Sequence, residues 1–325
     1  MTFPKSQKRL KTQIIINPES NKGQTGKKWG RIQEALKSFF KEFKYEFTEM
    51  PTHATEISRA AIKEGSELIV GVGGDGTMNE IANGFFENKK IINPDTSLGI
   101  VPSGTGSDFS KSLNIPPQLN QSIKVITQNN RSDIIDIGRV QYQSLKGESK
   151  ERFFLNIGDF GFGAEVVKQV EKKRLKRKAS SYLRSVIFTF ISYKNKRLNI
   201  KVDGKEYPTD DYLIGAISNG SIFGKGMKVA PLARLDDGFF DVILVKGMEK
   251  TEFFLNVWRL YQGTHLTHSK IAFLRGKKIE VSSANHEDVL IEVDGELIGK
   301  APAVFEIIPG SFPVRSNLTH TASPA

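Results

Sequence analysis

The 325-residue sequence contains no cysteine. This absence excludes disulfide scaffolds, thiol nucleophiles, iron–sulfur clusters and cysteine-ligated zinc. The sequence also lacks any apolar stretch near the ~20 residues that span a bilayer, and the short apolar run at 13–17 does not have the pattern of a signal peptide. We therefore expect no transmembrane segment and a cytoplasmic location.

Acidic residues are outnumbered, since 47 Lys and Arg stand against 36 Asp and Glu, which gives a net charge of +11. Such a surplus favours a nucleic acid, an anionic membrane or a phosphorylated ligand, or it forms only a solvated basic surface. The densest positive charge lies at 168–178, before an apolar stretch that ends at Tyr193. Membrane binding and a solvated helix face both remain open there. Because no recognisable nucleic-acid motif accompanies this segment, we expect no nucleic-acid partner.

The chain is longer than the ~100–200 residues of one domain and changes in pattern near residue 133. Before that point, short apolar runs alternate with helical patterns, which predicts a parallel α/β sheet. After it, closely spaced apolar runs predict antiparallel β structure, with one long helix at 164–193. We predict an α/β domain at 1–132 and a β-rich domain at 133–302, and we expect the polar tail after Val314 to be frayed.

The individual predictions follow the same patterns. The predicted strands are 13–17, 45–49, 68–72, 97–101, 133–142, 153–157, 199–202, 212–218, 239–245, 277–282 and 289–293, and the predicted helices of the first domain are 29–43, 53–64, 78–87 and 108–113.

A glycine-rich turn follows the predicted strand at 68–72 and reads Gly-Gly-Asp-Gly-Thr-Met-Asn-Glu over 73–80. Such a turn presents backbone amides to a phosphate at the start of a helix. Asp75 would repel phosphate unless a cation lay between them, so it predicts Mg²⁺ bound with the nucleotide. A second loop of the same build lies at 98–109, and two such loops beside each other form a nucleotide crevice. Neither loop matches the Walker A or dinucleotide-binding pattern.

Two further segments carry candidate chemistry. The loop within 15–28 is polar and basic, and Lys22, Lys27 and Lys28 could reach phosphates. Near the C-terminus, Asp294 and Glu296 would face the same side of an extended segment. One carboxylate could accept a hydroxyl proton, and the other could orient the hydroxyl or help hold a metal. A simple Asp-Gly hairpin turn is the alternative reading.

The order of these motifs resembles the diacylglycerol kinase catalytic superfamily, which includes sphingosine kinases, ceramide kinases and bacterial lipid kinases. The resemblance continues through the second half in the segments 156–164, 226–233, 236–238 and 293–296. It implies an α/β nucleotide-binding domain of the NAD kinase and phosphofructokinase type, followed by a mainly β sandwich domain. It also implies that the C-terminal segment 303–325 returns to complete the first domain.

The resemblance further implies an ATP- and Mg²⁺-dependent transfer of phosphate to a lipid hydroxyl, such as that of diacylglycerol, by an enzyme that associates peripherally with the membrane surface. The implied ATP-site residues are Asn17, Gly23, Thr48, Gly73, Gly74, Asp75, Gly76, Thr77, Met78, Asn79 and Thr105. The implied metal site uses the Asp237 carboxylate and the carbonyls of Arg234 and Phe239, although an Asp before Gly is also a common β-turn residue. Glu296 and Asp294 are implied as catalytic, with the base undecided between them. Ser107 departs from the family, which commonly has Asn there.

Other functions remain open. NAD kinases share the Gly-Gly-Asp-Gly-Thr signature, and the Asn79-Glu80 pair that follows favours the lipid branch. A non-catalytic nucleotide or lipid sensor would explain the basic surface, but the retained carboxylates at positions 75, 237, 294 and 296 argue against it. The sequence does not specify the lipid, and it leaves open a homodimer, which members of the family often form.

Overall fold

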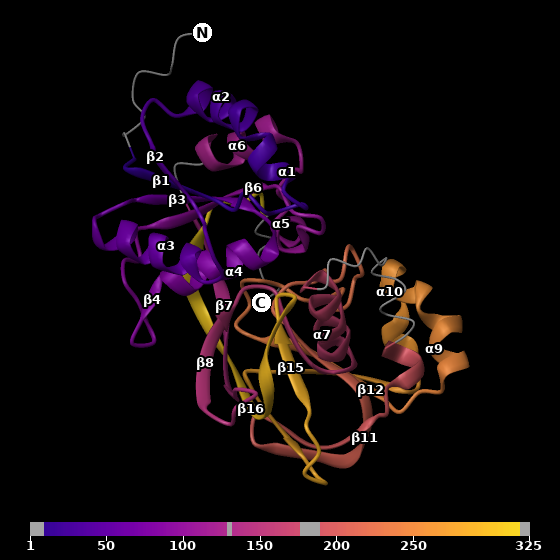
Figure 1. Ribbon diagram of the computed structural model, residues 1–325. Coiled ribbons are helices and arrows are strands. Elements are labelled where there is room, and N and C mark those ends of the chain that lie inside the picture. The colour runs from indigo at the N-terminus through magenta and orange to yellow at the C-terminus, as the bar shows by residue number, and fades with distance from the viewer. Residues whose placement is uncertain (1–9, 129–131, 176–188, 319–325) are drawn as a thin grey trace, which may run out of the picture. The chain divides into compact units, whose positions relative to one another are not determined.

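In the computed structural model, which describes residues 10–128, 132–175 and 189–318, the chain divides into two units (Figure 1). Unit 1 comprises residues 1–134 and 312–325, and unit 2 comprises residues 135–311. In this division residues 303–311 belong to unit 2, because strand β16 (Glu296–Val314) pairs there with strand β14 (Lys278–Ser283).

A parallel sheet forms the centre of unit 1. Its strands are β1 (Thr12–Ile16), β2 (Lys44–Phe47), β3 (Leu68–Gly73) and β6 (Ser97–Pro102). They lie in the order β6-β3-β1-β2, and the end of β16 joins β6 in parallel through Val314 and Leu98. Strands β1 and β3 are buried along their whole length, as expected for a parallel sheet that is covered on both faces.

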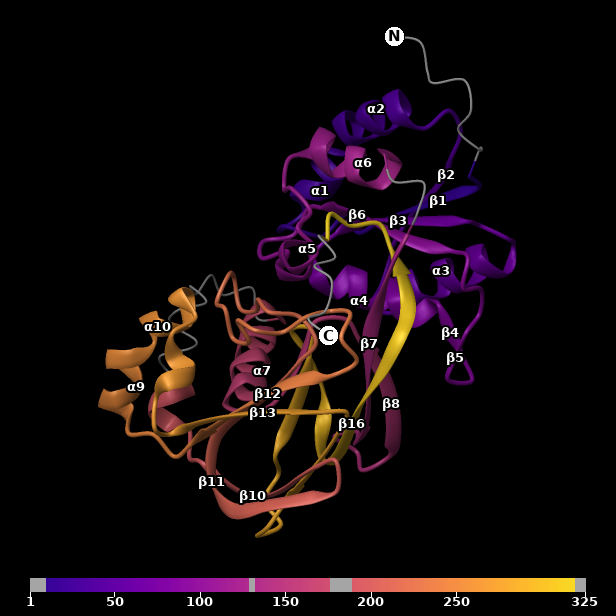
Figure 2. The ribbon, with the colours of Figure 1, turned by 180° about the vertical axis from the view of Figure 1, so that it is seen from behind.

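Two helices cover each face of this sheet (Figures 1 and 2). Helices α2 (Trp29–Phe39) and α6 (Leu119–Gln128) share one core with the strands, in which Leu36 and Ile123 pack with Val70. On the other face, helix α4 (Asp75–Gly84) packs against β3 and also against helix α3 (His53–Lys63). The sequence missed α6 and placed the start of α4 at residue 78, because the glycines before 78 resemble a loop. The smaller elements are α1 (Gln24–Lys27), α5 (Asp108–Ser112), β4 (Phe86–Glu87) and β5 (Lys90–Ile91).

The C-terminal return is packed into unit 1. Phe312 is fully buried, with its ring centroid 5.0 Å from that of Phe85. Arg315 and Ser316 are buried, and the Arg315 backbone N–H donates to the Leu98 carbonyl at 2.8 Å. The expected fraying after Val314 is therefore wrong for these two residues, because they are hydrogen-bonded beside β6. Residues 319–325 lie outside the described part of the chain.

Unit 2 is an antiparallel β structure, as predicted. Its remaining strands are β7 (Asp133–Gln143), β8 (Ser149–Phe154), β9 (Ile157–Gly161), β10 (Lys196–Val202), β11 (Lys205–Ser218), β12 (Phe240–Lys246), β13 (Ile271–Gly276) and β15 (Leu290–Val293). One series of neighbours runs β13-β12-β11-β10-β14-β16, while β15 pairs with β9 and β16, and β7 pairs with β8 and β16.

Aromatic rings fill the core of unit 2. The rings of Phe154 and Phe240 are stacked with centroids 5.6 Å apart, and Phe305 packs edge-on against Phe154. Phe154 also lies over Gly138, its partner across the β7–β8 pair, where a Cβ would come within 2.3 Å of the ring. A large ring beside a strand glycine fills the space that the absent side chain leaves.

Several boundaries in unit 2 differ from the sequence predictions. The predicted strand at 153–157 is two strands, β8 and β9, with a turn between them. The long helix predicted at 164–193 corresponds in part to helix α7 (Phe162–Leu175), and residues 176–188 of that prediction lie outside the described residues. Helices α9 (Lys250–Asn256) and α10 (Trp258–Gln262), the short 3₁₀ helix η1 (His265–Thr267) and strand β13 were not predicted. Over the described ranges, no helix is both long and apolar enough to cross a membrane.

Candidate active site

Three loops meet at the carboxyl ends of β1, β3 and β6 in unit 1, and Ser103 ties them together. Its carbonyl accepts hydrogen bonds from the hydroxyls of Ser20 at 3.1 Å and Thr25 at 3.2 Å, both in the first loop. Its own backbone N–H donates to the Gly73 carbonyl at 2.8 Å, at the start of the second loop. Ligands bind at this edge in open α/β sheets. The three loops predicted from the sequence therefore form one connected rim.

Asn17 makes a second link between the first loop and helix α4. Its side-chain amide donates to the Thr77 hydroxyl at 3.0 Å, and its side-chain oxygen accepts from the Glu19 backbone N–H at 3.0 Å. Both predicted ATP-site residues are thus brought together, although they stand far apart in the sequence.

Glycine is required where the second and third loops touch. A Cβ on Gly104 would lie 2.5 Å from the Gly74 Cα, and a Cβ on Gly73 would lie 2.5 Å from the Thr77 hydroxyl. These distances leave no room for any side chain. The first backbone amides of α4, which have no intrahelical acceptor, begin directly after Gly74. A helix start of this kind favours an anion.

Asp75 holds the third loop to the second. Its two carboxylate oxygens accept the backbone N–H groups of Asp108 and Phe109, each at 3.1 Å. These amides open helix α5, so the Asp75 carboxylate acts as its N-terminal cap. The carboxylate therefore has a structural task that the sequence did not suggest, while its contact with a cation stays a prediction.

The other predicted ATP-site residues are placed in different ways. Thr105 is exposed in the third loop, and Gly23 adopts a φ of +78° just before α1. The Thr48 backbone N–H donates to the Ile16 carbonyl at 2.8 Å, directly after β2. By contrast, Met78 and Asn79 are 1% and 0% exposed, so their side chains belong to the interior of unit 1.

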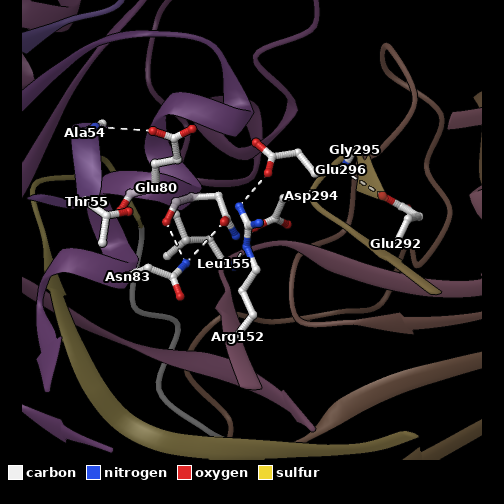
Figure 3. Close-up of polar contacts among 11 residues, drawn as sticks. Ala54, Thr55, Glu80, Asn83, Arg152, Leu155, Glu292, Asp294, Gly295 and Glu296 are labelled. Atoms are coloured by element: carbon white, nitrogen blue, oxygen red, sulfur yellow. Dashed lines mark hydrogen bonds and ion pairs between the residues drawn. The ribbon is translucent and has the colours of Figure 1, made fainter. Parts of the chain in front are cut away.

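In unit 2, Asp294 and Gly295 form the turn of the β15–β16 hairpin, with φ values of +49° and +86°. Positive φ at both central residues defines the tight turn for which Asp-Gly is preferred. The Asp294 carboxylate is buried and accepts the backbone N–H group of Leu155 at 2.8 Å (Figure 3). It also accepts the backbone N–H groups of Asn156 and Ile157, each at 3.0 Å. Asp294 therefore fixes the turn between β8 and β9.

Glu296 has a different environment. Its side chain is 32% exposed, and Oε2 accepts from the Arg152 guanidinium at 2.5 Å (Figure 3). The expectation that both carboxylates would lie on one side of an extended segment is wrong, because Asp294 is in a left-handed turn and Glu296 begins the next strand. Of the two, only Glu296 is accessible to a substrate.

Behind this turn lies a buried carboxyl pair that sequence reasoning missed. Asp159 and Glu292 are direct cross-strand neighbours on β9 and β15, and they are 2% and 0% exposed. Burial raises the pKa of Asp159 to about 7 and raises the pKa of Glu292 well above its ordinary range. Glu292 also accepts the Gly295 backbone N–H at 2.7 Å, which connects the pair to the hairpin turn (Figure 3).

The predicted metal turn at 234–239 is a tight loop of unit 2. Asp237 accepts the Phe239 backbone N–H at 3.1 Å through one oxygen and is ion-paired with Arg275 through the other. Asp136 supports the loop by accepting the Gly238 backbone N–H at 2.6 Å, and burial raises the pKa of Asp136.

The oxygen atoms of the 234–239 turn can be compared with the ligands that a magnesium ion requires. Carboxylate and carbonyl oxygens are the ligands that Mg²⁺ prefers, so the chemistry of Asp237 with the Arg234 and Phe239 carbonyls fits. The Arg275 guanidinium would compete with the cation for Asp237. Within residues 10–128, 132–175 and 189–318, no group of three or more His, Asp or Glu side chains could hold a metal. Any ion at this turn would therefore depend on carbonyls and water as well.

Removing Asp294 and removing Glu296 should have different effects on the stability of the protein. We expect Asp294→Ala to lower the free energy of unfolding by at least about 3 kcal/mol, since it strands three buried N–H groups at about 1–3 kcal/mol each. Glu296→Ala should cost less than about 1 kcal/mol, because it removes a partly exposed ion pair. Urea unfolding of both variants measures this, and equal losses would refute the division of roles.

The buried Asp159 should make stability depend on pH. The folded protein keeps this proton up to a pKa of about 7, whereas the unfolded chain loses it near the ordinary value of 3.8. Between these values Asp159 binds its proton in the folded state and not in the unfolded state, so its contribution to the free energy of unfolding falls as the pH rises. Asp159→Asn should make the free energy of unfolding fall less steeply from pH 4 to 7 in urea unfolding, while Glu292, whose pKa is also raised, still contributes. The exposed Asp288→Asn should keep the wild-type slope, and a wild-type slope in Asp159→Asn would contradict the assignment.

Comparison with known proteins agrees with this architecture. The family model described as diacylglycerol kinase catalytic domain matches residues 11–140, and that described as YegS C-terminal NAD kinase beta sandwich-like domain matches residues 157–316. Among solved structures, a diacylglycerol kinase from Bacillus anthracis str. Sterne has a TM-score of 0.70 at 21% identity, covering 96% of this chain and 98% of that one. Yeast NADH kinase has a TM-score of 0.52 at 12% identity, covering 97% of this chain and 85% of that one. The predicted fold class, a nucleotide-binding domain followed by a β sandwich domain, is confirmed.

Curated relatives match along most of their length. A protein named diacylglycerol kinase from Staphylococcus aureus is 30% identical over 91% of this chain and 89% of its own. One of the same name from Staphylococcus carnosus is 28% identical over 91% of this chain and 92% of its own. The resemblance inferred from the motifs is therefore confirmed. The chain belongs to the diacylglycerol kinase family, whose members are phosphotransferases with an alcohol group as acceptor.

Proposed function

We propose that the protein transfers the γ-phosphate of ATP to the hydroxyl of a membrane lipid such as diacylglycerol. The supporting observation is the combination of a three-loop rim in unit 1 with an accessible carboxylate in unit 2, in a chain whose full-length relatives are named diacylglycerol kinases. The proposal places the enzyme in the cytoplasm, with peripheral association at the membrane that holds its substrate.

Unit 1 would bind the phosphates of ATP. The backbone amides that open α4 would receive the phosphates, because a helix N-terminus favours an anion. Glycines 73, 74 and 104 would shape this site by letting the loops pack closely together. Asn17 lies at the same edge of the sheet, where its hydrogen bond to the buried Thr77 hydroxyl holds it in position. Met78 and Asn79 would contribute through their place in the helix, because their side chains are buried.

Unit 2 would supply the base. As the lipid hydroxyl oxygen forms a bond to the γ-phosphorus, its proton passes to the Glu296 carboxylate, the bond to the β-phosphate oxygen breaks, and ADP leaves. Arg152 orients Glu296, while Asp294 holds the turn that precedes it. We assign the base role to Glu296 rather than to Asp294, whose oxygens already accept three backbone amides.

Magnesium belongs to this proposal as well. The Asp237 carboxylate and the carbonyls of Arg234 and Phe239 would hold an ion. This ion would take the place of the Arg275 guanidinium at the carboxylate. The Mg²⁺ that Asp75 predicts with the nucleotide would supply charge neutralisation at the phosphates.

The direct test is label transfer from γ-labelled ATP, with Mg²⁺ and mixed micelles of candidate lipids. We expect label in a lipid with the wild type and a loss of about 10²–10⁴-fold in Glu296→Gln, the range for a general base. Glu306→Gln is the matched control, because the Arg139–Glu306 ion pair has nearly the same exposure in the same unit and is not part of the proposed site. It should keep wild-type activity.

Other outcomes would replace the proposal. Label in NAD⁺ and in no lipid would identify an NAD kinase. No transfer to any acceptor, with ATP still bound, would favour a nucleotide sensor. Full activity in Glu296→Gln would leave lipid kinase chemistry standing and remove Glu296 as the base.

A further inference from the structure

Helices α9 and α10 of unit 2 carry a concentrated exposed apolar surface, which we call the α9–α10 patch. It consists of Phe254, Leu255, Trp258 and Tyr261, which are 42%, 73%, 53% and 54% exposed. Exposed apolar residues scattered singly are normal, but a contiguous group marks an interaction site. These four residues lie within eight positions of sequence, on the helices labelled α9 and α10 in Figures 1 and 2. The patch is therefore a local feature of these two helices.

The opposite face of α9 is already packed. The Phe253 ring stacks on that of Phe190 with centroids 4.2 Å apart and meets Phe162 of α7 edge-on at 6.0 Å. A helix that only covered the core would carry polar residues on its outer face. Phe254 also meets Phe190 edge-on at 5.3 Å, so part of its ring packs within unit 2. Leu255, Trp258 and Tyr261 stay more than half exposed, so packing within unit 2 does not account for these three residues.

Trp258 is suited to an environment without water. Its indole N–H donates to the Leu255 carbonyl at 2.8 Å, so this donor keeps its partner when the ring leaves water. A polar group that is hydrogen-bonded within the protein avoids most of the cost of desolvation. Trp and Tyr are also the side chains that concentrate at the boundary between lipid headgroups and hydrocarbon.

Basic groups flank the patch. Arg259 belongs to α10 itself, and the Lys228 side chain lies against Gly263 at the end of α10. The acidic group of α9, Glu252, is paired with Lys270. An apolar stripe with Trp beside Lys and Arg is typical of helices that lie in the surface of an anionic membrane.

We propose that the α9–α10 patch inserts into the headgroup region of a bilayer that contains anionic lipid. A second copy of the chain is the rival occupant, but it would bring the same positive groups and a net charge of +11 on each partner together. An anionic leaflet offers the complementary charge. The inference rests on the proposed function, since a lipid kinase must reach a substrate held in a membrane, and it identifies the surface that makes this contact.

The chain provides its own reporter, because it contains only two tryptophans, Trp29 and Trp258. In a Trp29→Phe protein all tryptophan emission comes from the patch. Adding vesicles of phosphatidylglycerol and phosphatidylcholine should shift this emission to the blue, and pure phosphatidylcholine should shift it less. No shift with the anionic vesicles would overturn the proposal.

A pair of variants then separates docking from chemistry. Leu255→Asp should weaken vesicle binding by about tenfold or more, since it removes a buried Leu from the interface. It should lower the rate on a long-chain lipid in vesicles by a similar factor and leave the rate on a water-soluble short-chain analogue unchanged. Leu145→Asp is the control, because Leu145 is 56% exposed in the turn between β7 and β8 and should change neither rate.

The outcomes are distinguishable from failure of the proposed function. If the wild type does not phosphorylate the soluble analogue, the result would count against the proposed kinase function itself. If Leu255→Asp and the wild type phosphorylate lipid in vesicles at equal rates, membrane docking by the patch would be refuted, and the proposed kinase function would stand. The wild type could instead fail to bind vesicles and form a concentration-dependent dimer in analytical ultracentrifugation. If Leu255→Asp abolishes that dimer, a second copy of the chain covers the patch.

Discussion

The contact between Gly74 and Gly104 is the constraint on which the candidate nucleotide site depends. Two backbones from separate loops meet where a Cβ on Gly104 would approach the Gly74 Cα to 2.5 Å. Around this contact, Ser103 accepts two hydroxyls from the first loop and donates to Gly73, and Asp75 caps the helix that follows the third loop. The outcome is a fixed group of backbone amides at one edge of a parallel sheet, which is the arrangement that binds phosphate.

Unit 2 builds its candidate site by a different principle, in which buried carboxylates hold backbone turns. Asp294 gathers the amides between β8 and β9, Glu292 holds Gly295, and Asp136 holds Gly238. Each of these carboxyl groups is used for structure, whereas the Glu296 side chain is 32% exposed and is the group proposed as the base. A site that keeps its base rigid needs such support, because catalytic geometry tolerates little displacement.

Sequence reasoning predicted the alternation of strands and helices in unit 1, the antiparallel texture of unit 2 and the family, because these depend on local periodicity and on contiguous motifs. It could not predict which residues of the motifs would be buried. Met78 and Asn79 stand inside the glycine-rich motif, yet their side chains lie in the interior of unit 1. Asp159 and Glu292 are neighbours only through the β9–β15 register, which joins positions far apart in sequence. The division of labour between Asp294 and Glu296 likewise depends on a left-handed turn that extended-strand spacing does not reveal.

The central claim, that the three tied loops of unit 1 bind the phosphates of ATP, is tested most directly by hydrogen–deuterium exchange with and without a non-hydrolysable ATP analogue. The account predicts slower exchange of amides at 17–26, 73–78 and 103–109 together, and loss of this protection in Gly104→Val, which forces the loops apart. Protection confined to other segments, or protection that persists unchanged in Gly104→Val, would contradict it.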